Sequence, residues 1–378
     1  MRSIRPIKRI FFFPPRPICV NLDADSPSEV ALPKLVVGGK TVSPPFALAP
    51  LAELTEPPFR ALVRDLGGCG LFVAPMLTPA AIRAHETHRI PISEPRRDGD
   101  APLLVQFAPS RHDDVEASLA RLTGLIAPDG IDINMGCAAP RVRRAGAGAA
   151  LLAHPDAAID IVRRTRRAFP GTLAVKMRLP GNGSLDELHA FAARLAVEGV
   201  DAIALHPRIA REGFTHSARW ELVAALAAAL PIPVIGSGDV RAARTALERL
   251  ETSGAAAVMI GRGALRDPWI FSEIAALSEG RGFAPPTAAE LRDRILALAD
   301  GIAAAVFPEG RAAARIALAC GYLLEPTPFG RRVALELKHI GEVAAQRARL
   351  DRYFARLVAD GWSRPDSARH SSLTSKAT

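Results

Sequence analysis

The chain has 378 residues, of which 49% are hydrophobic and 23% are charged. This composition excludes a globally disordered chain, and the length predicts more than one folded unit. The 48 Lys+Arg against 39 Asp+Glu give a net charge of +9 and a pI near 10.0. That charge favours a polyanionic partner, although a chain rich in Arg throughout would carry it without binding one.

We expect residues 1–34 to form a disordered extension. Its apolar run, Ile10–Phe13, is interrupted by prolines and is far too short for a secretory core or a membrane span. The cysteines lie far apart, without the short paired spacings of metal sites or redox dithiols, at Cys19, Cys69, Cys137 and Cys320. We therefore predict no metal site, no membrane attachment and a reducing, cytoplasmic location.

From Phe46 onward, short apolar runs rich in β-branched residues alternate with segments of helical periodicity, such as Ala157–Ala168, Leu185–Glu198 and Ala242–Thr252. The runs are Phe46–Pro50, Leu71–Pro75, Pro102–Phe107, Gly130–Asn134, Leu173–Arg178, Ala202–His206, Pro233–Gly236 and Ala256–Gly261. Eight strands with this alternation suit a closed barrel, whereas an open doubly wound sheet would have a Gly-rich turn after its first strand. The sequence predicts an α/β fold, a (β/α)8 TIM barrel over residues 35–284.

Other elements flank the predicted barrel. Before it, Leu35–Val42 predicts a hairpin that plugs the N-terminal end. After it, helical periodicity places Leu291, Ile295, Leu298 and Ile302 on one face, so residues 285–360 are predicted to form a small C-terminal α-helical domain. Residues 361–378 are rich in Ser, Arg and Pro and are predicted to be a disordered tail.

The chemistry of such a barrel lies at the C-terminal ends of its strands, so the residues that close the predicted strands are the candidates. The fourth strand ends in Asp132-Ile133-Asn134-Met135-Gly136-Cys137, which places an amide and a thiol at the barrel mouth. A lone cysteine is more often a buried core residue, but one directly after a barrel strand favours a functional role. Thiols are mostly protonated at neutral pH, and no His and Asp pair typical of hydrolytic Cys enzymes can be read nearby. A proton donor is therefore favoured.

Basic residues and glycine-bearing loops close the later strands. Lys176 lies within an apolar strand and is either a cofactor ligand or an ion-paired structural lysine; His206, beside it at the barrel mouth, favours binding. The last strands end in Gly236-Ser237-Gly238-Asp239 and Gly261-Arg262-Gly263, which are typical of a barrel's phosphate site. The absence of a dinucleotide fingerprint favours a mononucleotide such as FMN.

Taken together, the segments from about Phe46 to Ile274 resemble the tRNA-dihydrouridine synthase family. The segment that ends at Cys137, with Gly146–Leu152 behind it, is similar to that family's active-site signature. Ala49-Pro50-Leu51-Ala52, with Thr55, Pro58, Phe59 and Arg60, resembles its opening strand and loop. The resemblance implies FMN as cofactor, NADPH as reductant, tRNA as substrate and a helical domain that grips the tRNA.

By this resemblance Cys137 protonates C5 of uracil while reduced FMN delivers hydride to C6. The implied cofactor-binding residues are Pro50, Leu51, Ala52, Gln106, Asn134, Lys176, His206, Ser237, Gly238, Asp239, Gly261 and Arg262, and the implied substrate-binding residues are Arg178 and Arg208. Candidates for tRNA contact in the helical domain, against an ordinary solvated surface, are Arg311, Arg315, Arg331, Arg332, Lys338, Arg347, Arg349 and Arg352. The oligomeric state is open, with a monomer slightly favoured.

The sequence departs from the family pattern at Leu51, Glu53, Pro75 and Ala138, where the family usually has Met, Gly, Glu and Pro. These departures indicate a divergent subfamily. Two alternatives stay open: an FMN barrel reductase of a free pyrimidine or small enone, and a non-catalytic tRNA-binding paralogue. The helical domain and the basic charge argue against the first, and the presence of Cys137, Lys176 and His206 argues against the second.

Overall fold

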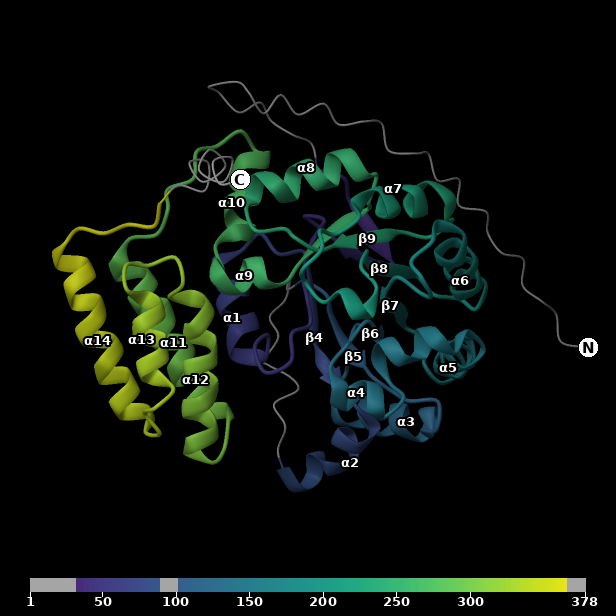
Figure 1. Ribbon diagram of the computed structural model, residues 1–378, viewed down its shortest axis with the longest axis horizontal. Helices are drawn as coiled ribbons and strands as arrows, with labels where there is room; N and C mark the ends of the chain where they lie inside the picture. Colours follow the sequence, from purple (N-terminus) through teal and green to yellow (C-terminus); the bar gives the residue numbers. More distant parts are fainter. Residues whose placement is uncertain (1–31, 89–100, 366–378) are drawn as a thin grey trace, which may run out of the picture.

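The computed structural model describes residues 32–88 and 101–365, and in them the chain forms a (β/α)8 barrel followed by a group of helices (Figure 1). The predicted fold class is therefore confirmed. The predicted N-terminal extension up to residue 31 and the predicted tail from residue 366 lie outside the described residues.

Eight parallel strands close the barrel in the order β10-β3-β4-β5-β6-β7-β8-β9. They are β3 (Phe46–Leu48), β4 (Leu71–Leu77), β5 (Leu103–Phe107), β6 (Gly130–Met135), β7 (Thr172–Arg178), β8 (Ala202–His206), β9 (Val234–Ser237) and β10 (Ala257–Ile260). Every predicted run overlaps one of them, and β4, β6, β7 and β9 extend one or two residues beyond their predicted runs. The runs are apolar along most of their length because one face packs on the helices and the other on the barrel interior.

Helices cover the outside of the barrel and fill its connections. They are α1 (Pro57–Leu66), α2 (Pro79–His88), α3 (Val115–Leu125), α4 (Pro140–Arg144), α5 (Pro155–Ala168), α6 (Leu185–Val197), α7 (Trp220–Ala229), α8 (Ala243–Ser253), α9 (Arg262–Arg266) and α10 (Ile270–Ser278). Short 3-10 turns occupy Gly148–Ala153 and Ala210–Glu212. The start of α6 shows why a helix begins where it does. The Ser184 side chain accepts a hydrogen bond from the Glu187 N–H, which would otherwise lack a partner in the first turn.

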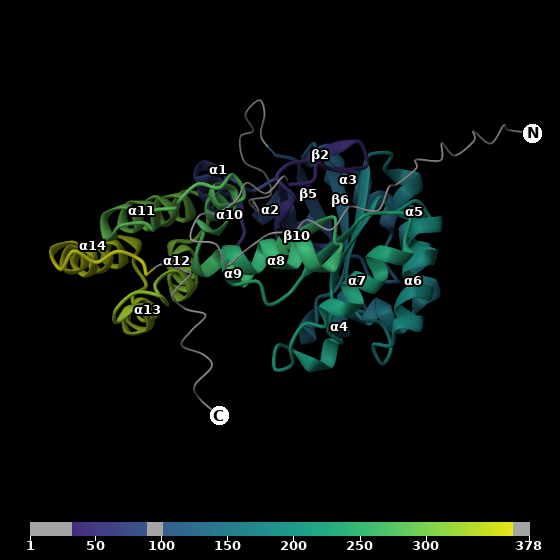
Figure 2. The same cartoon turned by 90° about the horizontal axis from the view of Figure 1, so that it is seen from above.

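The predicted hairpin is confirmed as β1 (Leu35–Val37) and β2 (Lys40–Val42), paired antiparallel. Its buried side chains pack against the barrel interior, where they meet Val73 and Leu104. In Figure 2, β2 lies at one end of the barrel and α4, which follows the C-terminal end of β6, lies at the other. The hairpin therefore closes the N-terminal end, and the mouth with the strand C-termini stays open.

The C-terminal helices are α11 (Ala288–Ala305), α12 (Glu309–Leu323), α13 (Gly330–Leu337) and α14 (Val343–Ala359). The face predicted for α11 is buried as expected. Gln346 of α14 is 1% exposed, and its amide donates to the carbonyls of Ala313, Leu337 and Ile340, which ties three helices together. No helix within the described ranges is both long and apolar enough to cross a membrane.

Arg315 of α12 joins these helices to the barrel mouth. Its guanidinium contacts the carboxylates of Glu56 at 3.1 Å and Glu53 at 3.4 Å, in the loop between β3 and α1. The Arg315 and Glu56 side chains are only 16% and 20% exposed. Arg315, a candidate for tRNA contact, is thus engaged within the protein, because the nearest charges available to it are those two carboxylates.

The start of the predicted disordered tail is ordered, which corrects the prediction for residues 361–365. The Arg364 N–H donates to the Pro286 carbonyl, and its side chain is 9% exposed and pairs with Asp267 and Glu273 of the barrel unit. The two ion pairs of Arg364 help to hold this short segment against the barrel unit. The composition of the tail does not reveal these long-range contacts.

Replacement of Arg315 by alanine leaves two neighbouring carboxylates without their cation. Since the pair with Glu56 is mostly shielded from solvent, we expect the free energy of unfolding to fall by about 1–2 kcal/mol. Arg332→Ala is the matched control, because Arg332 is 81% exposed and its one ion pair within the described part of the chain is with Glu336 on its own helix. Its effect should stay within about 0.5 kcal/mol. Chemical denaturation of both variants tests this, and equal midpoints would contradict it.

Candidate active site

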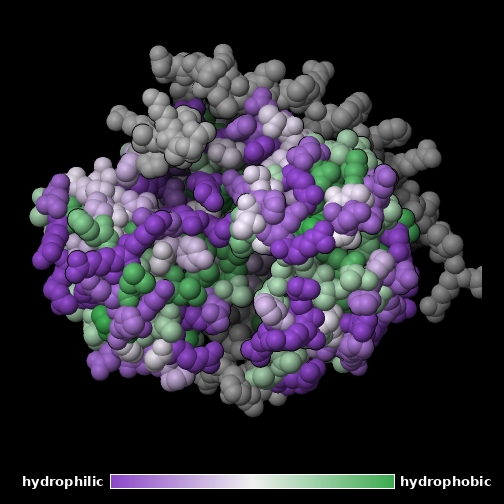
Figure 3. All heavy atoms as spheres, in the orientation of Figure 1, coloured by the Kyte–Doolittle hydropathy of each residue, from purple (hydrophilic) through white to green (hydrophobic). Residues whose placement is uncertain are grey.

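The C-terminal ends of the strands surround a cavity of about 420 Å³, a volume typical of small-molecule sites. Every predicted site residue except Arg208 lines it. Tyr322 of α12 also lines it, so the cavity lies between the barrel mouth and the C-terminal helices. The space-filling view shows a furrow between these two parts, bordered by both hydrophilic and hydrophobic side chains (Figure 3).

Hydrogen bonds to its backbone N–H and carbonyl groups hold the loop that carries Cys137. The Asn134 Oδ1 accepts hydrogen bonds from the N–H groups of Gly136 at 3.0 Å and Cys137 at 2.9 Å, and the Cys137 carbonyl accepts from the Ala149 N–H at 2.9 Å. Gly148 has a φ of +62°, and a Cβ there would lie 2.7 Å from the Cys137 carbonyl oxygen. The glycine-containing segment predicted to stand behind the cysteine therefore packs directly beneath it, and the half-buried thiol reaches the cavity.

Strand β7 supplies Lys176 and Arg178 beside this loop. Lys176 is the register partner of Asn134, and burial lowers the pKa of its ammonium, against the opposing charge of Asp132. Arg178 donates from Nε to the Gly136 carbonyl and from Nη1 to the Ile209 carbonyl, which fixes its guanidinium at the cavity wall. Among the residues that the structure describes, none accepts a hydrogen bond from the Lys176 ammonium, so this cation is available to a ligand.

His206 is neutral and its tautomer is defined by Arg208. The Arg208 Nη1 lies 3.0 Å from the His206 Nε2, and because a guanidinium only donates, Nε2 accepts and the ring proton resides on Nδ1. Burial, together with the charges of Lys176, Arg178 and other cations, lowers the pKa of His206 to about 2. The imidazole is therefore a fixed hydrogen-bonding group near neutral pH and not a proton shuttle.

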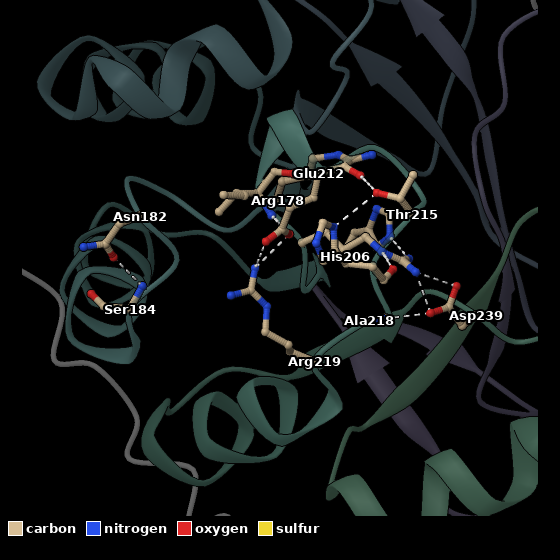
Figure 4. Close-up of polar contacts among 12 residues, drawn as sticks. Arg178, Asn182, Ser184, His206, Glu212, Thr215, Ala218, Arg219 and Asp239 are labelled. Carbon is tan, nitrogen blue, oxygen red and sulfur yellow. Dashed lines mark hydrogen bonds and ion pairs between the residues drawn. The ribbon is translucent and has the colours of Figure 1, made fainter. Parts of the chain in front are cut away.

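Arg208 lies behind the cavity wall, and its role as a substrate ligand stays a prediction. It is 2% exposed and absent from the cavity wall; its Nη2 pairs with the Asp239 carboxylate at 2.6 Å, and its Nε donates to the His216 carbonyl at 2.6 Å. Asp239 also accepts from the Ala218 N–H (Figure 4). Its carboxylate is thus engaged, so any contact of Asp239 with an anion is expected through its backbone.

The loops after β9 and β10 form a cationic end of the cavity. Arg241 and Arg262 both line it, and burial together with nearby Arg266 and Arg241 lowers the pKa of the Arg262 guanidinium. Gly238, with a φ of +126°, lets the chain turn closely over His206, since a Cβ there would lie 3.0 Å from the imidazole. A bound phosphate would relieve the mutual repulsion of these cations.

Sequence reasoning missed several residues of the cavity wall. Phe214, in the loop after β8, is 56% exposed, and the Arg262 guanidinium carbon lies 3.7 Å from the centre of its ring. The only sequence signal for Phe214 was an aromatic residue in a polar loop that follows a strand. Tyr322 and Met76 carried no signal, because the first reaches the cavity through helix packing and the second lies in a strand that continues past the predicted Pro75.

Comparisons with known proteins agree on one family. The profile of a family described as dihydrouridine synthase (Dus) matches residues 47–304. A probable tRNA-dihydrouridine synthase of Mycobacterium tuberculosis is 34% identical over 335 residues, 84% of this chain and 85% of that protein. A tRNA-dihydrouridine synthase B of Xanthomonas campestris is 35% identical over 263 residues (69% and 78%), and a probable tRNA-dihydrouridine synthase of Rhodobacter capsulatus is 35% identical over 242 residues (64% and 74%).

The low pKa of His206 predicts a specific loss of stability in acid. The folded value of about 2 lies below the ordinary 6.5, so as pH falls through 6.5 the unfolded chain gains a proton at this histidine that the folded chain does not. The free energy of unfolding should therefore fall by about 1.4 kcal/mol for each pH unit below 6.5 on account of this group. When denaturation is measured between pH 7 and 5, the free energy of unfolding of His206→Gln should fall less per pH unit than that of the parent. The surface variant His189→Gln should keep the parent's slope. Equal slopes for His206→Gln and the parent would contradict the assignment.

Proposed function

Because the chain belongs to the dihydrouridine synthase family, we propose that it reduces specific uridines in tRNA to 5,6-dihydrouridine, with FMN as the bound cofactor and NADPH as the reductant. The observation that carries the proposal is the cavity that joins the Cys137 thiol to a cationic pocket at the mouth of a barrel.

The residues of the cavity fit a flavin mononucleotide. An anionic ligand matches a wall that carries Lys176, Arg178, Arg241 and Arg262. Asp239, the one carboxylate of the wall among the described residues, is paired with a buried arginine. The Lys176 ammonium would meet the ring system and the loops after β9 and β10 would hold the phosphate. When bound and reduced, FMN would supply a hydride for C6 of the uracil ring.

The chain's own groups complete the reaction. Cys137, whose thiol faces the cavity, would donate a proton to C5 of the uracil ring, and the backbone contacts of its loop would keep the sulfur in place. Arg178, fixed by two carbonyls, would bind the base or the RNA backbone. His206 would contribute its Nδ1–H as a hydrogen-bond donor without changing its charge.

Basic side chains on the C-terminal helices support tRNA as the partner. A groove of about 680 Å³ between α13 and α14 is lined by Arg332, Arg349, Arg352 and Arg356. Arg332 and Arg349 share Glu336, whereas Arg352 and Arg356 are exposed and have no ion pair within the described chain. Exposed guanidinium groups in a concave surface suit the phosphates of RNA.

The direct test is an absorbance spectrum of the purified protein, followed by incubation with NADPH and unmodified tRNA and by nucleoside analysis. Bound FMN together with dihydrouridine is the expected result. Bound FMN without dihydrouridine, but with turnover of orotate or a small enone, would favour a free-pyrimidine or enone reductase. A colourless protein that binds tRNA would favour a non-catalytic paralogue.

Cys137→Ala should retain yellow FMN and its reduction by NADPH, because the thiol is expected to act only in proton transfer to the base. Formation of dihydrouridine should fall by roughly 100-fold or more, the usual range for loss of a general acid. Cys320→Ala, which removes a buried thiol from the C-terminal helices, is the control and should stay within about twofold of the parent. Undiminished turnover in Cys137→Ala would remove this residue from the mechanism.

Lys176→Met should weaken FMN binding by about tenfold or more, since it removes a cavity-lining cation whose charge has no hydrogen-bonded partner among the described residues. The control is Lys40→Met, which removes an exposed lysine paired with Asp129 at the closed end of the barrel. Titration of the flavin-free proteins with FMN, followed by flavin fluorescence, measures both affinities. If the two variants bound FMN equally well, the flavin role of Lys176 would be wrong.

A further inference from the structure

A ladder of buried polar side chains runs from the cavity wall into the barrel. Gln106 of β5 and Asp132 of β6 are register partners, and Asn134 lies two residues beyond Asp132 on the same face of its strand. The three residues are only 2%, 2% and 6% exposed. Asp132 does not line the cavity, so it cannot act on a ligand directly.

The hydrogen bonds in this ladder run in one direction. A carboxylate only accepts, so the Gln106 Nε2 faces Asp132, at 2.6 Å from Oδ2. The Gln106 Oε1 must then face Asn134, whose Nδ2 donates to it at 2.6 Å. The Asn134 Oδ1 is left for the N–H groups of Gly136 and Cys137. Backbone N–H groups only donate, so both ends of the ladder require the same orientation of the two amides.

The orientation of Asn134 decides whether the cysteine loop is held. If its amide turned over, Nδ2 would face the N–H groups of Gly136 and Cys137, and two hydrogen bonds would become donor–donor contacts. Such contacts in a buried site cost on the order of 1–3 kcal/mol each, enough to displace the loop. A displacement of about 1 Å at a reacting group lowers a rate by up to about 100-fold.

We propose that Asp132 is a positioning residue that orients Gln106 and Asn134 in series and thereby holds Cys137 in place for proton transfer. The effect on catalysis rests on the proposed function, whereas the effect on the loop does not. Asp132 acts through its charge and its acceptor-only character. An uncharged amide in its place would offer a donor as well as an acceptor, and Gln106 would no longer be restricted to one orientation.

A double-mutant cycle tests the direction of the ladder. Asp132→Asn removes the fixed acceptor, and Gln106→Glu places a second carboxylate against Asp132. In the double variant, the amide at position 132 donates to the carboxylate at position 106, which also accepts from the Asn134 Nδ2. The hydrogen bond between positions 106 and 132 is then reversed, but the single charge is restored and Asn134 again faces a group that can only accept. Asp201→Asn is the control, because Asp201 accepts from Arg166 and the Leu173 N–H at the closed end of the barrel.

Two rates are measured in each variant: alkylation of Cys137 by iodoacetamide, resolved by peptide mass spectrometry, and reoxidation of the NADPH-reduced flavin by tRNA. Both single variants should alkylate at least about threefold faster and reoxidise at least about tenfold more slowly. In Asp132→Asn, whose site does not line the cavity, flavin reduction by NADPH should change less than about threefold. The double variant should return both rates toward the parent, and Asp201→Asn should leave them unchanged. A purely structural role would instead slow reduction and reoxidation alike, without rescue.

Failure of rescue in a folded double variant would overturn the proposal, as would parent-like rates in both single variants. If neither single variant folds, the double variant decides alone: it must fold and alkylate within about threefold of the parent, and an unfolded double variant would also overturn the proposal. A parent protein that forms no dihydrouridine would refute the proposed function. The alkylation rates would still test whether Asp132 holds the Cys137 loop in place.

Discussion

Closure of eight parallel strands into one ring is the constraint on which the site depends, because it brings the C-terminal ends of distant segments to a single rim. Hydrogen-bonded register then sets the neighbours. Gln106 stands beside Asp132, Asn134 beside Lys176, and Arg178 beside His206. The residues of each pair are distant in the chain and become adjacent without any local sequence relation, and each is held by backbone that is itself buried.

The same ring separates an apolar end from a polar end. On β5 the inward positions are Leu104, which meets the hairpin, and then Gln106, which meets the cavity. On β6 the inward positions pass from Gly130 to Asp132 and Asn134. Buried polar groups need partners, and these residues find them in one another. The polarity of the strands therefore changes along their length, and the chemistry is confined to the open end.

Much of this arrangement was predictable because it is encoded locally. Short β-branched runs bounded by glycine and proline identified the strands, and the barrel topology then placed residues that end them, such as Cys137 and His206, at one mouth. The part that was not predictable depends on side-chain contacts between distant elements. Arg208, like the residues predicted to bind ligands, comes shortly after the end of a strand. Its buried position behind Asp239 depends on the fold of the following loop, which the sequence does not reveal. Arg364 was predicted to lie in a polar tail, because its two acidic partners are distant in the sequence.

Glu53 shows how the C-terminal helices belong to the site. Its φ of +69° lies in the left-handed region, which costs a residue with a side chain roughly 1 kcal/mol and explains why the family usually has glycine there. In this chain the side chain at that position reaches Arg315 of α12, and Tyr322 of the same helix lines the cavity. Pro50, Leu51 and Ala52, which precede Glu53 in the same loop, line the cavity as well. Helix α12 thus contacts the loop after β3 through Arg315 and lines the cavity through Tyr322. The C-terminal helices therefore act as one side of the active site and not as a separate attachment.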